Sequence, residues 1–68
     1  MGLVNNVFYD RKEDITYVIR RPSRMTRAQI VQELRLILPQ IPPKMRPKRH
    51  TTMILDPTIG TLHVRTGR

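Results

Sequence analysis

One strong helix pattern lies between Pro22 and Pro39, and it constrains the fold most because the rest of the chain must be arranged around it. Thr26 as N-cap, with Gln29 three residues later, forms a capping box. Pro39 ends the pattern because the residue before a proline avoids helical angles. Apolar side chains recur at helical spacing on one face, at Ile30, Val31, Leu34, Ile37 and Leu38. The sequence therefore predicts one helix over residues 27–38.

Two pairs of strand patterns flank this helix. Residues 3–9 and 15–20 alternate between β-branched or aromatic and other side chains, and charged residues 10–14 between them predict a solvated hairpin turn. Residues 51–55 and 61–65 form the second pair, joined by a turn-forming string, Asp56-Pro57-Thr58-Ile59-Gly60. The expected fold is a two-layer α+β domain of order β-β-α-β-β, with one helix packed on a four-stranded sheet.

Residues 39–49 contain four prolines, which favour an extended, polyproline-like path after the helix. Basic residues alternate with the prolines. The sequence predicts an extended basic strip made of Lys44, Arg46, Lys48 and Arg49.

The chain has 68 residues, which predicts a single small domain over residues 1–68. Only 38% of the residues are hydrophobic, so the core is too small to enclose a deep substrate pocket. There is no cysteine, which excludes disulfides and thiol chemistry and favours an intracellular, cytoplasmic location. The first residues lack the pattern of a signal peptide, and the longest apolar run, residues 36–38, predicts no membrane association.

Positive charge dominates the composition. Thirteen Lys and Arg, ten of them Arg, oppose five Asp and Glu, which gives a net charge of +8. Arginine matches phosphate and carboxylate geometry. We therefore expect a non-catalytic protein that engages a polyanion, most concretely DNA or RNA. The alternative is a protein-protein interaction module that docks on an acidic protein surface.

Eight of the thirteen basic residues lie in two runs, which are the candidate nucleic-acid or anion-binding sites. The first run surrounds the expected helix start, where free backbone N–H groups favour phosphate, and Ser23 and Thr26 lie nearby. The second run is the basic strip after the helix. The candidate residues are Arg20, Arg21, Arg24, Arg27, Lys44, Arg46, Lys48 and Arg49.

No residue set predicts catalysis, a metal site or a cofactor. Ser23 is the sole serine and is flanked by arginines, and His50 and His63 have no carboxylate at ligand spacing. Aromatic residues are few, so a stacking platform for RNA bases is not expected. Tyr9 and Tyr17 flank the first turn and are expected to pair across the hairpin.

The element order and three short strings resemble the ubiquitin-like proteins with the β-grasp fold. The strings are Ile15-Thr16-Tyr17-Val18-Ile19 in the second strand, Ile41-Pro42-Pro43 after the helix and Thr61-Leu62-His63-Val64 in the last strand. The resemblance implies a minimal β-grasp that presents its sheet or an edge strand to partners. The chain ends Thr66-Gly67-Arg68, without the paired glycine of conjugating members. A homodimer or a subunit of a larger complex is compatible with this resemblance.

Overall fold

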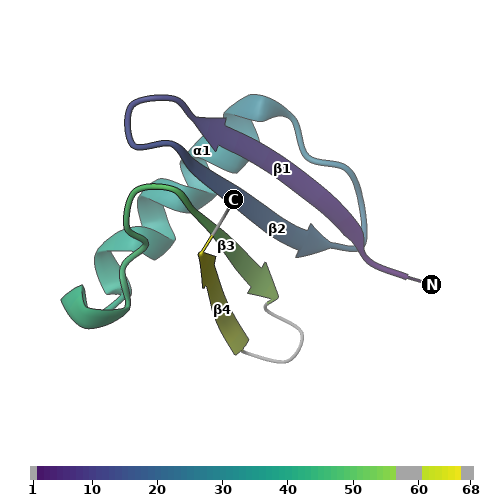
Figure 1. The fold of residues 1–68 in the computed structure, drawn as a ribbon. Coiled ribbons are helices and arrows are strands. Elements are labelled where there is room, and N and C mark those ends of the chain that lie inside the picture. Colours follow the sequence, from purple (N-terminus) through teal and green to yellow (C-terminus); the bar gives the residue numbers. More distant parts are fainter. Residues whose placement is uncertain (1, 57–60, 67–68) are drawn as a thin grey trace.

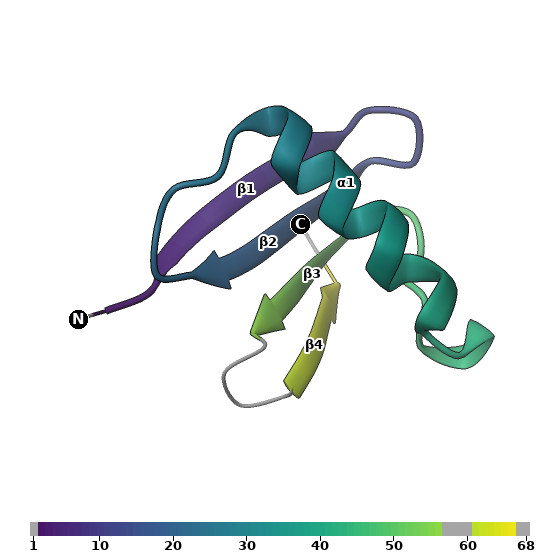
Figure 2. The same ribbon diagram turned by 180° about the vertical axis from the view of Figure 1, so that it is seen from behind.

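The computed structural model describes residues 2–56 and the backbone of residues 61–66. Two strands, β1 (Val4–Asp10) and β2 (Ile15–Arg21), precede the helix α1 (Arg27–Ile37). Two short 3-10 turns follow, and then β3 (Thr51–Asp56) and β4 (Thr61–Thr66). The helix crosses one face of the sheet, as Figures 1 and 2 show from opposite sides. The capping box predicted at the start of α1 is confirmed, since Thr26 and Gln29 exchange both hydrogen bonds.

The hydrogen-bonded order of the strands follows the sequence, β1-β2-β3-β4. β1 and β2 form an antiparallel hairpin, in which Phe8 lies opposite Tyr17. β2 and β3 are parallel, with Tyr17 beside Met53, and α1 makes the crossover between them. The backbone of β4 runs antiparallel along the far side of β3.

The predicted fold class was wrong. The structure supports a small α+β fold of order β-β-α-β, in which the described side chains that pack against α1 come from β1, β2 and β3, and β4 is described only as a backbone that runs along β3. The described sheet side chains beneath α1 all come from these three strands. A helix of 11 residues is about 16 Å long and about 10 Å wide. Three strands spaced about 4.8 Å apart are wide enough to support it.

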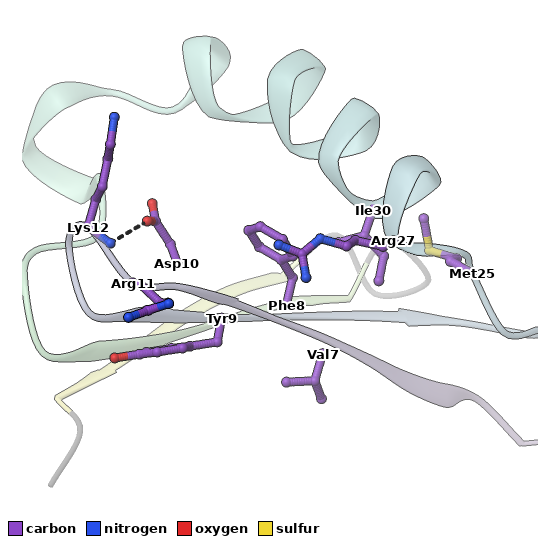
Figure 3. A pocket seen from close by; sticks show the side chains of 9 residues that line it. All are labelled: Val7, Phe8, Tyr9, Asp10, Arg11, Lys12, Met25, Arg27 and Ile30. Carbon is purple, nitrogen blue, oxygen red and sulfur yellow. Dashed lines mark hydrogen bonds between the residues drawn. The ribbon is translucent and has the colours of Figure 1, made fainter.

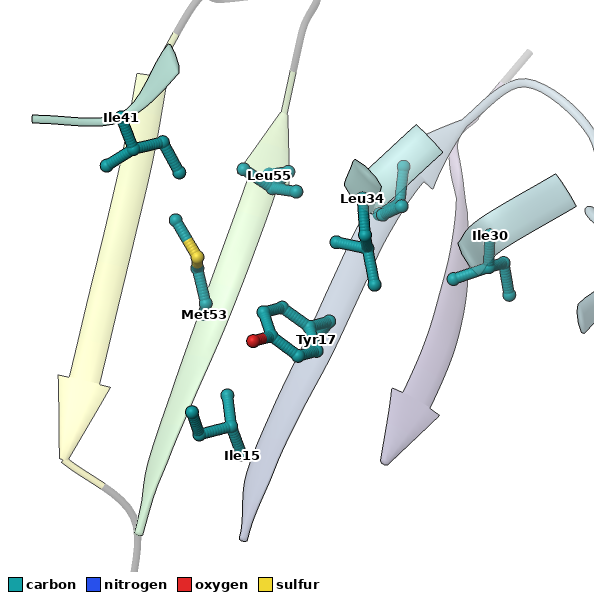
Figure 4. Close-up of a cluster of buried hydrophobic side chains, with 8 residues drawn as sticks. Ile15, Tyr17, Ile30, Leu34, Ile41, Met53 and Leu55 are labelled. Carbon is teal, nitrogen blue, oxygen red and sulfur yellow. The ribbon is translucent and has the colours of Figure 1, made fainter. Parts of the chain in front are cut away.

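The hydrophobic core lies between α1 and the inner face of the sheet (Figure 4). Strand alternation directs every second side chain of β2 and β3 inward, and Ile19 and Met53 are fully buried. The predicted apolar face of the helix supplies Ile30 and Leu34. The complete set of buried hydrophobic residues is Ile15, Tyr17, Ile19, Ile30, Leu34, Ile41, Met53 and Leu55. Burying each aliphatic side chain of this kind contributes about 1.5–3 kcal/mol to folding.

The segment after the helix is compact, so the prediction of an extended path over residues 39–49 was wrong. It contains two 3-10 turns, η1 (Leu38–Gln40) and η2 (Pro43–Met45), each with a proline in its first two positions. Proline presets the φ angle that such a turn needs. Ile41 lies between the turns with 3% exposure and anchors the segment to the core.

The loop between β2 and α1 is tied to β1 by the buried side chain of Asn6. Its amide Nδ2 donates to the Ser23 and Ile19 carbonyls, both at 3.2 Å, and its Oδ1 accepts from the Met25 N–H at 2.7 Å. This network holds the loop against the first half of β1. The second half of β1 lies beside the start of α1, where it borders the groove described below.

Two further predictions concern the turns and the aromatic residues. The expected pairing of Tyr9 with Tyr17 was wrong, because the hairpin register places Tyr9 opposite Thr16 and so on the other face of the sheet. Tyr17 contacts Phe8 instead, with ring centroids 6.5 Å apart. The turn expected over residues 56–60 is not described, because residues 57–60 lie outside the described residues.

Candidate anion-binding groove

The four arginines of the first predicted run do not form one cluster. Arg20 lies on the outer face of the sheet, where its Nε donates to Asn5 Oδ1 at 3.1 Å and its guanidinium lies 3.6 Å from the Asp56 carboxylate. Arg21, the next residue in the strand, lies on the helix side and forms an ion pair with Glu33. Successive strand residues face opposite ways, so Arg20 and Arg21 are separated by the sheet itself.

The remaining two arginines of this run flank the loop and the helix start. Arg24 is exposed and lines a shallow depression, about 460 Å³ in volume, between the loop and α1. Arg27 is exposed at the first position of α1, and its guanidinium lies 5.2 Å from the centroid of the Phe8 ring. The arginine stem thus covers part of the core edge while its charge stays in solvent.

The helix start is less available to phosphate than its sequence suggested. The Gln29 N–H donates to Thr26 Oγ1 at 3.2 Å, and the Thr26 N–H donates to Gln29 Oε1 at 2.8 Å. These capping bonds satisfy two of the backbone donors that a phosphate would use. The arginine placements and the capping box together weaken the idea of a phosphate site at the helix terminus itself.

The second predicted run, residues 44–49, lies beyond the far end of the helix and leads into β3. Lys44, Lys48 and Arg49 are exposed, and Arg46 Nε donates to the Ile41 carbonyl at 3.1 Å. β2 and β3 are parallel, so the start of β3 lies beside the start of β2 and far from its end. Lys48 and Arg49 therefore lie at the opposite end of the sheet from Arg20 and Arg21.

A groove joins basic and apolar side chains at the edge of the sheet (Figure 3). It lies between the second half of β1 and the start of α1 and has a volume of about 570 Å³. Three cations border it, Arg11 and Lys12 from the hairpin turn and Arg27 from the helix. The other residues that line the groove are Val7, Phe8, Tyr9, Asp10, Met25 and Ile30.

One acidic side chain borders the groove, and it has a structural partner. Asp10 Oδ1 accepts a hydrogen bond from the Lys12 backbone N–H at 2.9 Å. This bond is typical of an Asx turn and fixes the path of the hairpin tip. Three cations against one carboxylate leave the groove with an excess of positive charge.

Sequence reasoning missed Arg11 and Lys12 as site residues, because they stand in a run of mixed charge, residues 10–14, that was interpreted as a solvated turn. The structure places the hairpin turn and the helix start at different ends of one groove, so that Arg27 completes the set of cations around it. Nothing in the local sequence of residues 10–14 indicates that this turn borders a groove with the helix start.

The tip of the hairpin is itself held by a chain of hydrogen bonds. The Tyr9 hydroxyl donates to Asp14 Oδ1 at 2.7 Å, and His50 Nδ1 lies 2.5 Å from Asp14 Oδ2. The bonds from Tyr9 and His50, with the nearby charge of Arg49, lower the pKa of Asp14 below its ordinary value of 3.8. The same bond from Asp14 raises the pKa of Tyr9. This network links the turn beside the groove to the basic segment before β3.

Comparisons with known proteins return no relative: no family model, no curated protein and no solved structure matches the chain. The resemblance to ubiquitin-like proteins therefore stays a prediction. In the described part of the chain, no helix has the length and apolar character needed to cross a membrane.

Proposed function

We propose that this protein is a non-catalytic binding protein that engages a polyanion, and that the polyanion is nucleic acid. The single observation that carries the proposal is the groove at the β1 edge, where Arg11, Lys12 and Arg27 border a floor that contains the Phe8 ring. Cations neutralise phosphates and release their counterions. An aromatic ring and an arginine plane offer stacking surface to bases.

The balance of ion pairs supports the same proposal. Among the lysines and arginines that the structure describes, only Arg20 and Arg21 lie within ion-pair distance of a carboxylate. The other described Lys and Arg side chains keep their charge available to a ligand. Arg24, Lys44, Lys48 and Arg49 would then extend the contact beyond the groove as secondary phosphate contacts. An intracellular location, favoured by the lack of cysteine, belongs to this proposal.

A fluorescence anisotropy titration with labelled oligonucleotides at several salt concentrations tests the proposal. If about five phosphates are contacted, log affinity should fall against log salt with a slope near −4.5 for duplex DNA or near −3.5 for a single strand. Absence of binding at low salt overturns the proposal.

A matched pair of helix variants tests the place of binding. Arg27→Gln and Arg35→Gln remove the same charge from exposed positions of α1, and only Arg27 borders the groove. We expect Arg27→Gln to weaken binding severalfold more than Arg35→Gln. Equal losses would show that general charge, not the groove, is responsible.

A second candidate function is a protein-protein interaction module, and the exposed edge of β1 favours it. β1 has a strand neighbour on one side only, and Val7 and Tyr9 are 58% and 49% exposed. An edge strand can accept an extended segment of a partner. The excess of positive charge would select an acidic partner. Capture of a protein partner from nuclease-treated lysate, with no affinity for oligonucleotides, would favour this function.

A further inference from the structure

The proposed function leaves open which form of nucleic acid is bound. Resting on that function, we infer that the ligand is single-stranded, with one base seated in the groove between Arg27 and the β1 edge. Three separate features of the described residues support this inference: the apolar floor of the groove, the position of Arg27 over Phe8 and the distribution of the cations.

The floor of the groove is suited to a base and not to a phosphate backbone. Phe8, Met25 and Ile30 give it apolar surface on the helix side of β1, while the cations stand at its border. A duplex turns its phosphates outward and keeps its bases stacked inside, so it has no apolar surface to place on this floor. An unstacked base of a single strand has two apolar faces.

The guanidinium of Arg27 lies at cation–π distance from an aromatic ring. It lies over the Phe8 ring at 5.2 Å, and Phe8 is in turn fixed against Tyr17 in the core. Arg27 is exposed, so a base can approach the guanidinium without displacing a core residue. A planar cation held in place loses little conformational freedom when a base stacks on it. Arg11 and Lys12 then stand at the hairpin end of the groove to meet the flanking phosphates.

The cations also lie on more than one side of the molecule. Arg27 borders the β1 edge, Arg24 lies in the loop before α1, and Lys48 and Arg49 lie at the hairpin end of the sheet. A duplex is stiff over about 150 base pairs, so it reaches only the charges on one face. A single strand is flexible and can follow a curved path from the groove to the segment before β3. The dispersed charge therefore fits the flexible ligand.

The experiment compares four unlabelled competitors against one labelled single strand: the same single strand, a duplex of equal length, an abasic single strand of equal length, and poly-glutamate of equal charge. We expect the single strand to compete best, with the abasic strand weaker by about fivefold or more, since one stacked base contributes at least that much. Duplex and poly-glutamate should compete less well than the single strand.

Each other outcome has a definite meaning. No binding of any nucleic acid at low salt overturns the proposed function together with this inference. Binding in which the duplex competes as well as the single strand, or the abasic strand as well as the normal strand, overturns this inference and leaves the proposed function standing. Poly-glutamate that matches the single strand shows that the protein selects negative charge and not nucleic acid, and overturns both.

Two conservative variants separate stacking from charge. Arg27→Lys keeps the positive charge but removes the planar guanidinium, and Arg35→Lys makes the same change elsewhere on α1. We expect Arg27→Lys to weaken binding of the normal strand severalfold while leaving binding of the abasic strand and the circular dichroism spectrum unchanged. Arg35→Lys should bind like the parent. Equal effects of Arg27→Lys on normal and abasic strands would overturn the stacking role.

Discussion

Asp14 and His50 lie 36 positions apart in the sequence and are joined twice, through their backbones and through their side chains. The His50 N–H donates to the Asp14 carbonyl at 3.0 Å, while His50 Nδ1 contacts the Asp14 carboxylate. Among the described non-glycine residues these are the two with positive φ, 53° at Asp14 and 64° at His50. The pair fastens the tip of the first hairpin to the segment that enters β3.

The left-handed backbone at His50 predicts an unusual order of stability for two variants. Both His50→Gly and His50→Ala remove the imidazole and its contact with Asp14. Only glycine adopts a positive φ without steric strain, which costs other residues about 1–2 kcal/mol. We expect His50→Gly to be more stable than His50→Ala by about 1 kcal/mol in urea denaturation. The reverse order would show that position 50 relaxes to another conformation.

The lowered pKa of Asp14 predicts a pH-dependent contribution to stability. The pKa is lower in the folded protein than in the unfolded chain, so ionised Asp14 stabilises the fold above its ordinary pKa of 3.8. This contribution is lost as the pH falls through the folded-state value. We expect Asp14→Asn, which tolerates the same backbone angles, to lower the melting temperature at pH 7 and to match the parent in strong acid. A constant difference across the pH range would contradict a role for the charge.

The pKa of Tyr9 gives a second test of the hydrogen bond between the Tyr9 hydroxyl and the Asp14 carboxylate. Its bond to Asp14 favours the protonated phenol and raises the pKa of Tyr9 above 10.0, while burial raises the pKa of Tyr17. Asp14→Gly removes the acceptor without straining the backbone. We expect ultraviolet absorbance titration to show one of the two tyrosines returning toward 10.0 in this variant. Tyr9→Phe serves as the control, because it should remove the tyrosine transition that moves.

We predict that the buried side chain of Asn6 makes a large contribution to the free energy of unfolding, although no sequence pattern indicates it. It is 5% exposed, and its side chain joins β1 and β2 to the loop that carries Ser23 and Met25. Asn6→Ala leaves the buried partners of these bonds unsatisfied, at a cost of about 1–3 kcal/mol. Asn5→Ala, at the exposed neighbouring position, should cost about 0.5 kcal/mol or less. Equal losses in urea denaturation would contradict the bridging role of Asn6.

Local patterns in the sequence determined the elements themselves. The capping box at Thr26 and Gln29, the apolar helix positions at Ile30 and Leu34, and the alternation in residues 15–20 each depend on neighbours within four residues. Such patterns report backbone periodicity and capping chemistry directly. They placed α1 and the first hairpin close to their observed bounds, and they identified Ile30 and Leu34 as core residues.

Only the tertiary structure decided which charged residues come together. The crossover through α1 makes β2 and β3 parallel neighbours, which separates Arg20 and Arg21 from the basic strip of residues 44–49. The same arrangement places Arg11, Lys12 and Arg27 around one groove, and joins Asp14 to His50. Strand order and register are set by the packing of the whole layer, and no local period encodes them. The abundance of positive charge is therefore a property of the sequence, whereas the groove that the charge borders is a product of the fold.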